Sequence, residues 1–226
     1  MADRAIGIPI VREGLPFVAA AAGAAALVAS LGWTGPDILL GGLTLFTGWF
    51  FRNPRRVPPC RPGTVVAPGD GRVMAVDEEF EPRYLKERSI RISIFLNIFD
   101  VHVNRIPCAG MVEEVAYHPG QFLAANRPEA TVRNEQNAVM IRTLSGSKVL
   151  CVQVAGLIAR RIVCWVTAGE SVPCGERFGL IRFGSRMDTF LPIGTKIAVS
   201  VGDCVRGGET LLGELSEMEA PCAQRS

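Results

Sequence analysis

The sequence predicts a mainly β, barrel-sandwich domain that carries a helical hairpin at its amino-terminal end. Two uncharged apolar segments fill most of the first 51 residues. Short β-branched runs separated by glycine and proline fill the remainder, which is typical of strands and tight turns. Near the carboxyl end, over residues 201–214, glycines and an aspartate separate short apolar runs in the style of lipoyl and biotinyl carrier domains.

The two apolar segments predict a hairpin over residues 1–51. Leu15–Trp33 is uncharged and would reach about 28 Å as a helix, close to the thickness of a bilayer core. After a break at Thr34–Asp37, Ile38–Phe51 is also uncharged but short for a full span. We therefore expect a hairpin that spans the membrane or dips into one leaflet. A signal peptide and a buried or interfacial helix are the alternatives.

Charges around the hairpin indicate its orientation. Arginines precede it and follow it, which favours both ends on the cytoplasmic side. The seven cysteines agree with that side, because an odd number without a CxxC pair is typical of free thiols in a reducing compartment. We therefore expect the rest of the chain at the cytoplasmic face of a membrane.

Residues 52–226 predict the β domain. The strongest strand signal is at 90–98, where isoleucine or leucine occupies nearly every second position. The pattern shifts by one residue near Phe99–Asp100, which indicates a bulge or bend that re-aims His102. Pro68–Gly71 lies between two β-branched runs and predicts a β-hairpin, whereas residues 81–89 predict a loop and 121–130 a short helix or a loop. Further strands are expected at 111–117, 137–143, 148–155 and 161–167.

Composition excludes some classes of function. The net charge of +2 comes from 24 basic and 22 acidic residues, so no basic stripe indicates a nucleic-acid partner. Only two histidines are present, which excludes a histidine-rich metal site. We expect no metal cofactor.

Ser185 is the candidate for covalent chemistry. A Gly-Ser pair is in most proteins only a turn. However, a serine hydroxyl can attack the carbonyl of the residue before it, and Gly184 permits the sharp bend that this attack needs. The acyl group then shifts from nitrogen to oxygen. Elimination leaves dehydroalanine, and hydrolysis leaves a pyruvoyl group and ammonia, with the chain cut between 184 and 185.

The other candidate residues have plain structural alternatives. His102 is the first candidate for proton transfer near neutral pH, although a histidine at the end of a strand is often structural. His118, before Pro119, is structural or lies beside the substrate. Asp70 stands in a turn where aspartate usually bonds its own backbone. Guanidinium groups match phosphate oxygens, so the candidates for anion binding are Arg105, Arg160 and Arg161.

Several segments in order resemble one family, the short bacterial and archaeal form of phosphatidylserine decarboxylase. Each segment alone is a weak signal, but together they cover nearly the whole chain. The segments are Phe50–Arg56, Ala67–Gly71, Asp100–Arg105, Gln153–Gly156 with Ala159–Ile162, and Arg182–Asp188.

The resemblance implies a proenzyme that is cut between Gly184 and Ser185 into a β chain, 1–184, and an α chain, 185–226. The two chains would form a heterodimer, and a higher oligomer stays open. The pyruvoyl group made from Ser185 would form a Schiff base with phosphatidylserine in the membrane and accept electrons as carbon dioxide leaves. The product would be phosphatidylethanolamine, so the pathway is phospholipid biosynthesis.

The resemblance also implies roles for two further residues. His102 matches the family histidine linked with decarboxylation, and Asp70 matches the aspartate of the self-cleavage triad. The longer bacterial form has a second histidine three residues after the first, where this chain has Arg105. Either His102 therefore serves both steps, or cleavage relies on strain and Asp70 alone.

Three rival functions fit the sequence less well. A membrane-anchored serine-lysine endopeptidase needs a lysine base, but neither Lys148 nor Lys196 stands in a supporting pattern. A carrier module needs a lysine at a hairpin tip, where Lys148 has unsuitable neighbours. A pyruvoyl enzyme for another amino acid remains, but the apolar hairpin argues against it.

Overall fold

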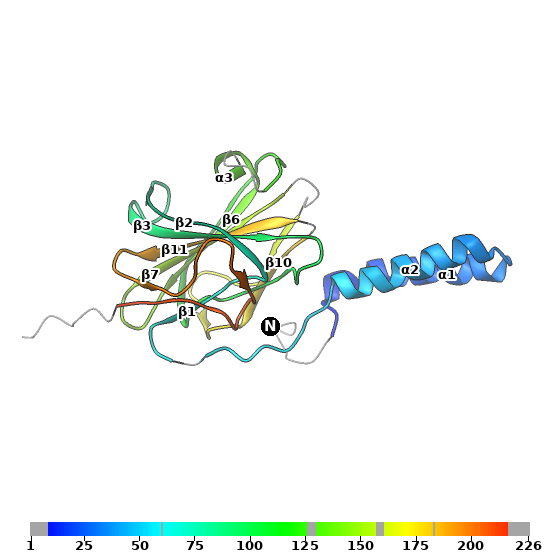
Figure 1. The fold of residues 1–226 in the computed structure, drawn as a ribbon, viewed down its shortest axis with the longest axis horizontal. Helices are drawn as coiled ribbons and strands as arrows, with labels where there is room; N and C mark the ends of the chain where they lie inside the picture. Colours follow the sequence, from blue (N-terminus) through cyan, green and yellow to red (C-terminus); the bar gives the residue numbers. More distant parts are fainter. Residues whose placement is uncertain (1–8, 60, 126–129, 157–160, 183, 217–226) are drawn as a thin grey trace, which may run out of the picture.

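The computed structural model describes residues 9–59, 61–125, 130–156, 161–182 and 184–216. A helical hairpin projects from one end of a β domain, as the blue ribbons of Figure 1 show. A short 3₁₀ turn, Arg12–Gly14, leads into α1 (Leu15–Ser30), and α2 (Thr34–Phe50) returns to the domain. The predicted helical hairpin is confirmed, although α2 begins earlier than expected because Pro36 fits the first turn of a helix.

Apolar side chains cover the outside of this hairpin. No residue of α1 is buried, and Ile38, Leu39 and Leu45 of α2 are each about three-quarters exposed, at 76%, 74% and 77%. Within the described chain, one helical stretch, Arg12–Ser30, is long and apolar enough to cross a membrane. Such a surface is unusual in contact with water and favours association with a membrane.

Three antiparallel sheets build the β domain. The largest has eight strands in the order β13-β2-β3-β11-β7-β6-β5-β9, and the two smaller ones have the orders β1-β14-β12 and β4-β10-β8. The strands of the large sheet are β2 (Gly71–Glu81), β3 (Glu87–Leu96), β5 (Gly110–His118), β6 (Gln136–Arg142), β7 (Lys148–Val154), β9 (Ser171–Val172), β11 (Ser185–Pro192) and β13 (Cys204–Val205). Those of the small sheets are β1 (Thr64–Val66), β12 (Lys196–Ile197), β14 (Leu211–Glu214), β4 (Val103–Arg105), β8 (Ile162–Cys164) and β10 (Arg177–Ile181).

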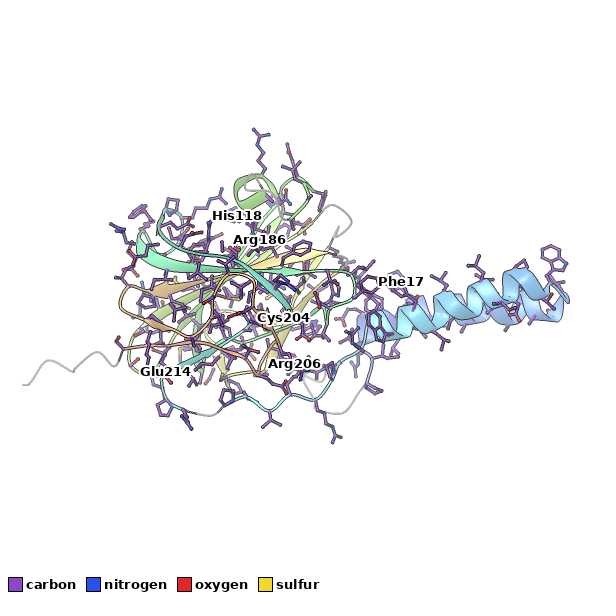
Figure 2. The ribbon with its side chains drawn as sticks, in the orientation of Figure 1. Phe17, His118, Arg186, Cys204, Arg206 and Glu214 are labelled. Carbon is purple, nitrogen blue, oxygen red and sulfur yellow. The ribbon has the colours of Figure 1, made fainter. Side chains whose placement is uncertain are left out.

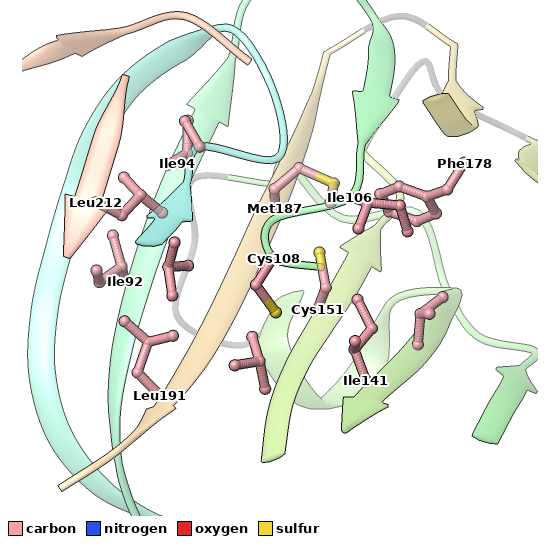
Figure 3. Packing of buried hydrophobic residues seen from close by; sticks show 14 of the residues in the cluster. Ile92, Ile94, Ile106, Cys108, Ile141, Cys151, Phe178, Met187, Leu191 and Leu212 are labelled. Carbon is pink, nitrogen blue, oxygen red and sulfur yellow. The ribbon is translucent and has the colours of Figure 1, made fainter. Parts of the chain in front are cut away.

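The main core lies between the curled large sheet and the two small ones. Ile92 and Met187 from the large sheet meet Leu212 and Phe178 from the small sheets, as Figure 3 shows. Every second residue of β3 contributes to this core, as the alternating pattern predicts. The mainly β fold class is thereby confirmed, and the five described cysteines that the structure classifies are free thiols.

Two local predictions were wrong. The runs on either side of Pro68–Gly71 do not pair with each other, because β1 pairs with β14 while β2 pairs with β3 and β13. Residues 81–89 are not one loop, since β2 and β3 extend into that stretch and leave a tight connection at 82–86. In both places long-range pairing decides the structure, and local turn chemistry does not encode it.

The other local predictions hold with small shifts. Strands occur at each of the four expected places, although β8 is shorter than predicted. Of the expected bulge or bend near Phe99–Asp100, the structure has the bend, a turn at residues 97–100 through which the chain leaves the large sheet and enters β4. Between residues 121 and 130, part of the stretch lies outside the described residues, and a short helix, α3, occupies Ala130–Arg133.

Candidate active site

Ser185 is the first residue of β11, a central strand of the large sheet. Its neighbours β3 and β7 both pair with β11, and Ser185 lies opposite Leu96. The side chain is fully buried, and its Oγ has no hydrogen-bond partner among the described residues. A buried hydroxyl without a partner is uncommon, because its desolvation is not compensated. The exception indicates a functional constraint at this position.

Gly184 bends the chain just before that strand. Its φ of +64° lies in the left-handed region, which glycine adopts without a steric penalty. Its carbonyl oxygen lies so close to the Cα of Gly156 that a Cβ on Gly156 would overlap it. The carbonyl that Ser185 would attack is thus held in a narrow gap that only glycine at position 156 leaves open.

A buried asparagine braces this gap. The Asn134 side-chain amide donates to the backbone carbonyl of Ala155 at 2.7 Å and accepts from the N–H of Leu123 at 2.9 Å. It therefore ties the segment after β7 to the segment that precedes α3. The wall around the Gly184 carbonyl is held from two sides.

His102, just before β4, contacts the backbone of Gly184. The N–H of Gly184 donates to its Nε2 at 3.3 Å, and its Nδ1 lies 3.0 Å from the carbonyl oxygen of Asp100. Since a carbonyl can only accept, the proton resides on Nδ1 and the Nε2 lone pair points toward residue 184. The imidazole is a neutral base directed at the candidate cleavage site.

The surroundings of His102 are apolar. Its ring packs on Phe50, the last residue of α2, with 4.3 Å between ring centroids, and no part of the side chain is exposed. Burial lowers the pKa of His102 from 6.5 to about 4, outweighing the opposing effect of its bond to Asp100. The ring is therefore neutral at physiological pH.

Asp70 lies in a neighbouring polar cluster. Its carboxylate accepts from Arg56 Nη2 at 2.6 Å and from the N–H of Gly207 at 2.7 Å, and Arg56 also contacts Glu209. Among the described residues, no hydrogen bond joins Asp70 to His102 or Ser185. Its charge nevertheless helps burial to raise the pKa of Asp100, so Asp70 acts on the surroundings of His102 through space.

Arg105 lies beside that cluster and holds the chain together. Its guanidinium donates to the carbonyl oxygens of Gly175 and Pro54, each at 2.9 Å. Burial lowers its pKa to about 10. Both described hydrogen bonds of this guanidinium go to backbone, which is the pattern of a structural brace and leaves fewer donors for a substrate.

The remaining candidate residues make no described contact with Ser185, Gly184 or His102. His118 is exposed at the end of β5 and packs edge-on against Tyr84. Arg161 is exposed just before β8, and Arg160 lies outside the described residues. No described contact links His118 or Arg161 to Ser185.

Sequence reasoning missed several residues that shape the site. Arg186 and Asp188 form a buried ion pair on the opposite face of β11, with 2.9 Å between Nε and Oδ1. Arg186 also donates to the carbonyl oxygen of Ala125, a residue that packs near Gly156. Gly156 stood inside a quoted motif, but its close approach to Gly184 brings together two segments that are distant in sequence.

Together these residues suit an acyl shift from nitrogen to oxygen within the chain. A buried hydroxyl without a described partner follows a left-handed glycine, a neutral imidazole accepts from the N–H of that glycine, and Gly156 confines its carbonyl. These residues fit a pyruvoyl group built at position 185, since the reacting atoms already lie inside the protein and away from water.

Comparison with known proteins identifies the family. The family model for phosphatidylserine decarboxylase matches residues 43–213. A phosphatidylserine decarboxylase proenzyme of Syntrophus aciditrophicus is 48% identical over 208 residues, covering 90% of this chain and 96% of that protein. Proenzymes of the same name from Nitrosomonas europaea and Burkholderia vietnamiensis are 49% and 46% identical over 208 residues, covering 91% and 92% of this chain and 94% and 97% of those proteins.

Fold, site and relatives together define an enzyme of the carboxy-lyase class that is made as a proenzyme. More specifically, the chain belongs to the phosphatidylserine decarboxylase family.

Proposed function

We propose that this protein cuts itself between Gly184 and Ser185 and then converts phosphatidylserine to phosphatidylethanolamine and carbon dioxide. The observation that carries the proposal is the buried, unpartnered Ser185 Oγ beside a left-handed Gly184 whose N–H is bound by His102. The names of the relatives supply the substrate.

His102 is proposed as the base for self-cleavage. The Nε2 lone pair, which accepts from the N–H of Gly184 in this structure, would exchange that bond for the Ser185 hydroxyl and take its proton as Oγ attacks the Gly184 carbonyl carbon. The proton then passes to the amide nitrogen as the C–N bond breaks. Loss of the Cα proton of residue 185 expels the Gly184 carboxylate and leaves dehydroalanine. Addition of water then releases ammonia and leaves the pyruvoyl group. The engagement of Asp70 by Arg56 supports His102 over Asp70 in this role.

The same residues suit the second reaction. The pyruvoyl group supplies an electron sink for the electrons that carbon dioxide leaves behind. Residue 185 stays anchored between β3 and β7, which keeps the reacting end of the α chain rigid. Phe50 and His102 form a dry wall, which favours a step in which the charge of a carboxylate is lost.

The α and β chains are proposed to remain a heterodimer, because β11 is held on both sides by strands of the β chain. The exposed apolar hairpin supports a location on the bacterial cell membrane, with the catalytic domain at its cytoplasmic face. The domain assignment, hairpin 1–51 and catalytic domain 52–226, is part of this proposal.

Intact-mass measurement tests the cleavage. Purified protein is expected to give two chains that divide at 184–185, with an α chain that lacks a free amino terminus. Ser185→Ala should remain one chain, while the control Ser145→Ala, in an exposed turn, should be cut normally. His102→Ala should slow cleavage at least tenfold, which is a typical loss for a general base. A folded wild-type protein that decarboxylates its substrate but stays in one piece would overturn the proposal.

A further inference from the structure

Arg182 places a guanidinium group next to the candidate cleavage site. It follows β10 and stands two residues before Gly184. Its Nε is buried and has no hydrogen-bond partner among the described residues. By contrast, Arg52 donates to two backbone carbonyls and Arg186 is paired with Asp188. A buried guanidinium donor without an acceptor is costly, and it indicates a ligand that is missing from the protein itself.

The position of Arg182 connects the membrane to the site. Its guanidinium carbon lies 5.2 Å from the ring centroid of Phe17, which is in the first turn of α1 where the hairpin joins the domain. Figure 2 labels Phe17 at this junction. Arg182 and Ser185 are three positions apart in the chain, so their Cα atoms lie at most about 10 Å apart. A lipid bound at the hairpin would therefore pass Arg182 on the way to Ser185.

The local charge favours an anion. Arg161 is close enough to help burial lower the pKa of Arg182, while Glu13, which acts in the opposite direction, accepts a hydrogen bond from Trp165 at 2.8 Å. No described ion pair joins Glu13 to Arg182. Two guanidinium groups thus share a region with one carboxylate, whose Oε1 is engaged by Trp165 and whose Oε2 has no described hydrogen-bond partner, so the local charge is net positive.

On these grounds we propose that Arg182 binds the phosphodiester of the lipid substrate and so sets the depth at which its amine reaches residue 185. This inference rests on the proposed function. The planar guanidinium fork matches the two non-ester oxygens of a phosphodiester. The phosphate keeps its charge throughout the reaction. An ion pair to the substrate carboxylate would instead stabilise the ground state of a group that must lose its charge, and would slow decarboxylation.

The test uses two soluble probes that differ in the phosphate. Glycerophosphoserine has the amine, the carboxylate and the phosphodiester, whereas O-methylserine lacks the phosphodiester. Each is titrated onto self-cleaved full-length protein with cyanoborohydride, which links the amine to the pyruvoyl carbon, and the mass of the α chain reports the adduct. Soluble probes keep membrane binding of the hairpin out of the result.

Arg182→Gln is expected to raise the half-saturating concentration of glycerophosphoserine about tenfold or more and to leave that of O-methylserine unchanged. Arg182→Lys keeps the charge but loses the fork, so an intermediate shift for glycerophosphoserine is expected, and this variant carries the test if the glutamine variant is not cut. Arg88→Gln, which removes the same charge from an exposed site, should behave as wild type.

Equal losses for the two probes would assign Arg182 to the carboxylate or to general folding and would overturn the inference. Unchanged titrations in both Arg182 variants would overturn it as well. In either case a wild-type protein that is cut at 184–185 and traps both probes leaves the proposed function standing. A wild-type protein that is never cut would instead remove the proposed function, so the two failures are distinguishable.

Discussion

The carbonyl oxygen of Gly184 lies against the Cα of Gly156. In the proposed self-cleavage, this contact fixes the position of the carbonyl group that the Ser185 hydroxyl attacks. Reactions between groups that are held in place gain much of their rate from orientation, and small displacements are costly. The backbone of Gly184 cannot yield easily, because its N–H is bound by His102. We therefore propose that Gly156 is a positioning residue for the proposed self-cleavage.

Replacing this glycine should block maturation without unfolding the protein. In Gly156→Ala, the added methyl group pushes the Gly184 carbonyl out of its gap, so we expect self-cleavage at least tenfold slower than in wild type. The fraction of uncut chain over time, measured by intact mass, reports the rate. Gly41→Ala is the matched control, since a Cβ there meets no atom within 4 Å.

Folding of the variant needs its own readout. Thermal unfolding of Ser185→Ala should occur at a lower temperature once Gly156→Ala is added, because the methyl group overlaps the Gly184 backbone, but a single cooperative transition should remain and show that the variant folds. Cleavage of Gly156→Ala at the wild-type rate would show that the carbonyl has another resting place and that the contact does not position it.

Among the elements, α2 reaches the site directly. Its last residue, Phe50, covers the ring of His102, and Phe51 closes over Gly14 so tightly that no side chain would fit there. Phe50 and Phe51 belong to a second apolar cluster, separate from the main core, whose other buried members are Val11, Val101, Val103 and Leu180. The hairpin is therefore part of the wall that keeps His102 dry and neutral, in addition to its apolar outer surface.

The pKa of His102 should report this wall. In wild type we expect His102 to titrate near pH 4, well below 6.5, because the ring is desolvated. Phe50→Ala should admit water and raise this pKa toward 6.5. Proton NMR of the His102 ring follows the titration, with Phe80→Ala, at an exposed aromatic residue on β2, as the control.

The same shift has a consequence for stability. Between pH 6.5 and about 4 the unfolded chain binds a proton at His102 that the folded protein does not. Stability is complete above 6.5 and falls as the pH is lowered through this window, by up to about 3 kcal/mol. The loss should be smaller in Phe50→Ala. A wild-type His102 that titrates at its ordinary pKa would contradict the dry wall.

The whole molecule has two surfaces of different character. The β domain buries its apolar residues between three sheets, while the hairpin extends away from it and exposes them, as Figure 1 shows. The site lies at the junction, where α2 ends on His102 and α1 begins near Arg182. A lipid in the membrane and a catalytic group in the domain can meet only at such a junction.

Charge on the hairpin should release the protein from membranes. Ile38→Glu combined with Leu45→Glu places two carboxylates on its exposed apolar face, and we expect at least a tenfold smaller fraction to float with phosphatidylglycerol-containing vesicles. Self-cleavage should persist, because neither residue packs on the β domain. The matched control is Val57→Glu with Leu144→Glu, which are 82% and 99% exposed on the domain. Equal flotation of both double variants would contradict membrane binding through the hairpin.

The hairpin and the strand-rich domain could be predicted from the sequence, because apolar periodicity and turn residues are local properties of the chain. The order of the motifs could be read directly from it. It also led to Ser185, His102 and Asp70 through a resemblance that the family comparison supports. Sequence proximity was misleading around Pro68–Gly71, where the flanking strands joined different sheets.

Which of these residues contact one another could be seen only in the folded chain. It brought Gly156 against Gly184 and Phe50 against His102, and it engaged Asp70 with Arg56 and Arg105 with backbone carbonyls. Such contacts depend on strand register and on the packing of segments many residues apart. These contacts are stabilised by the packing of the whole fold, so no local sequence pattern predicts them.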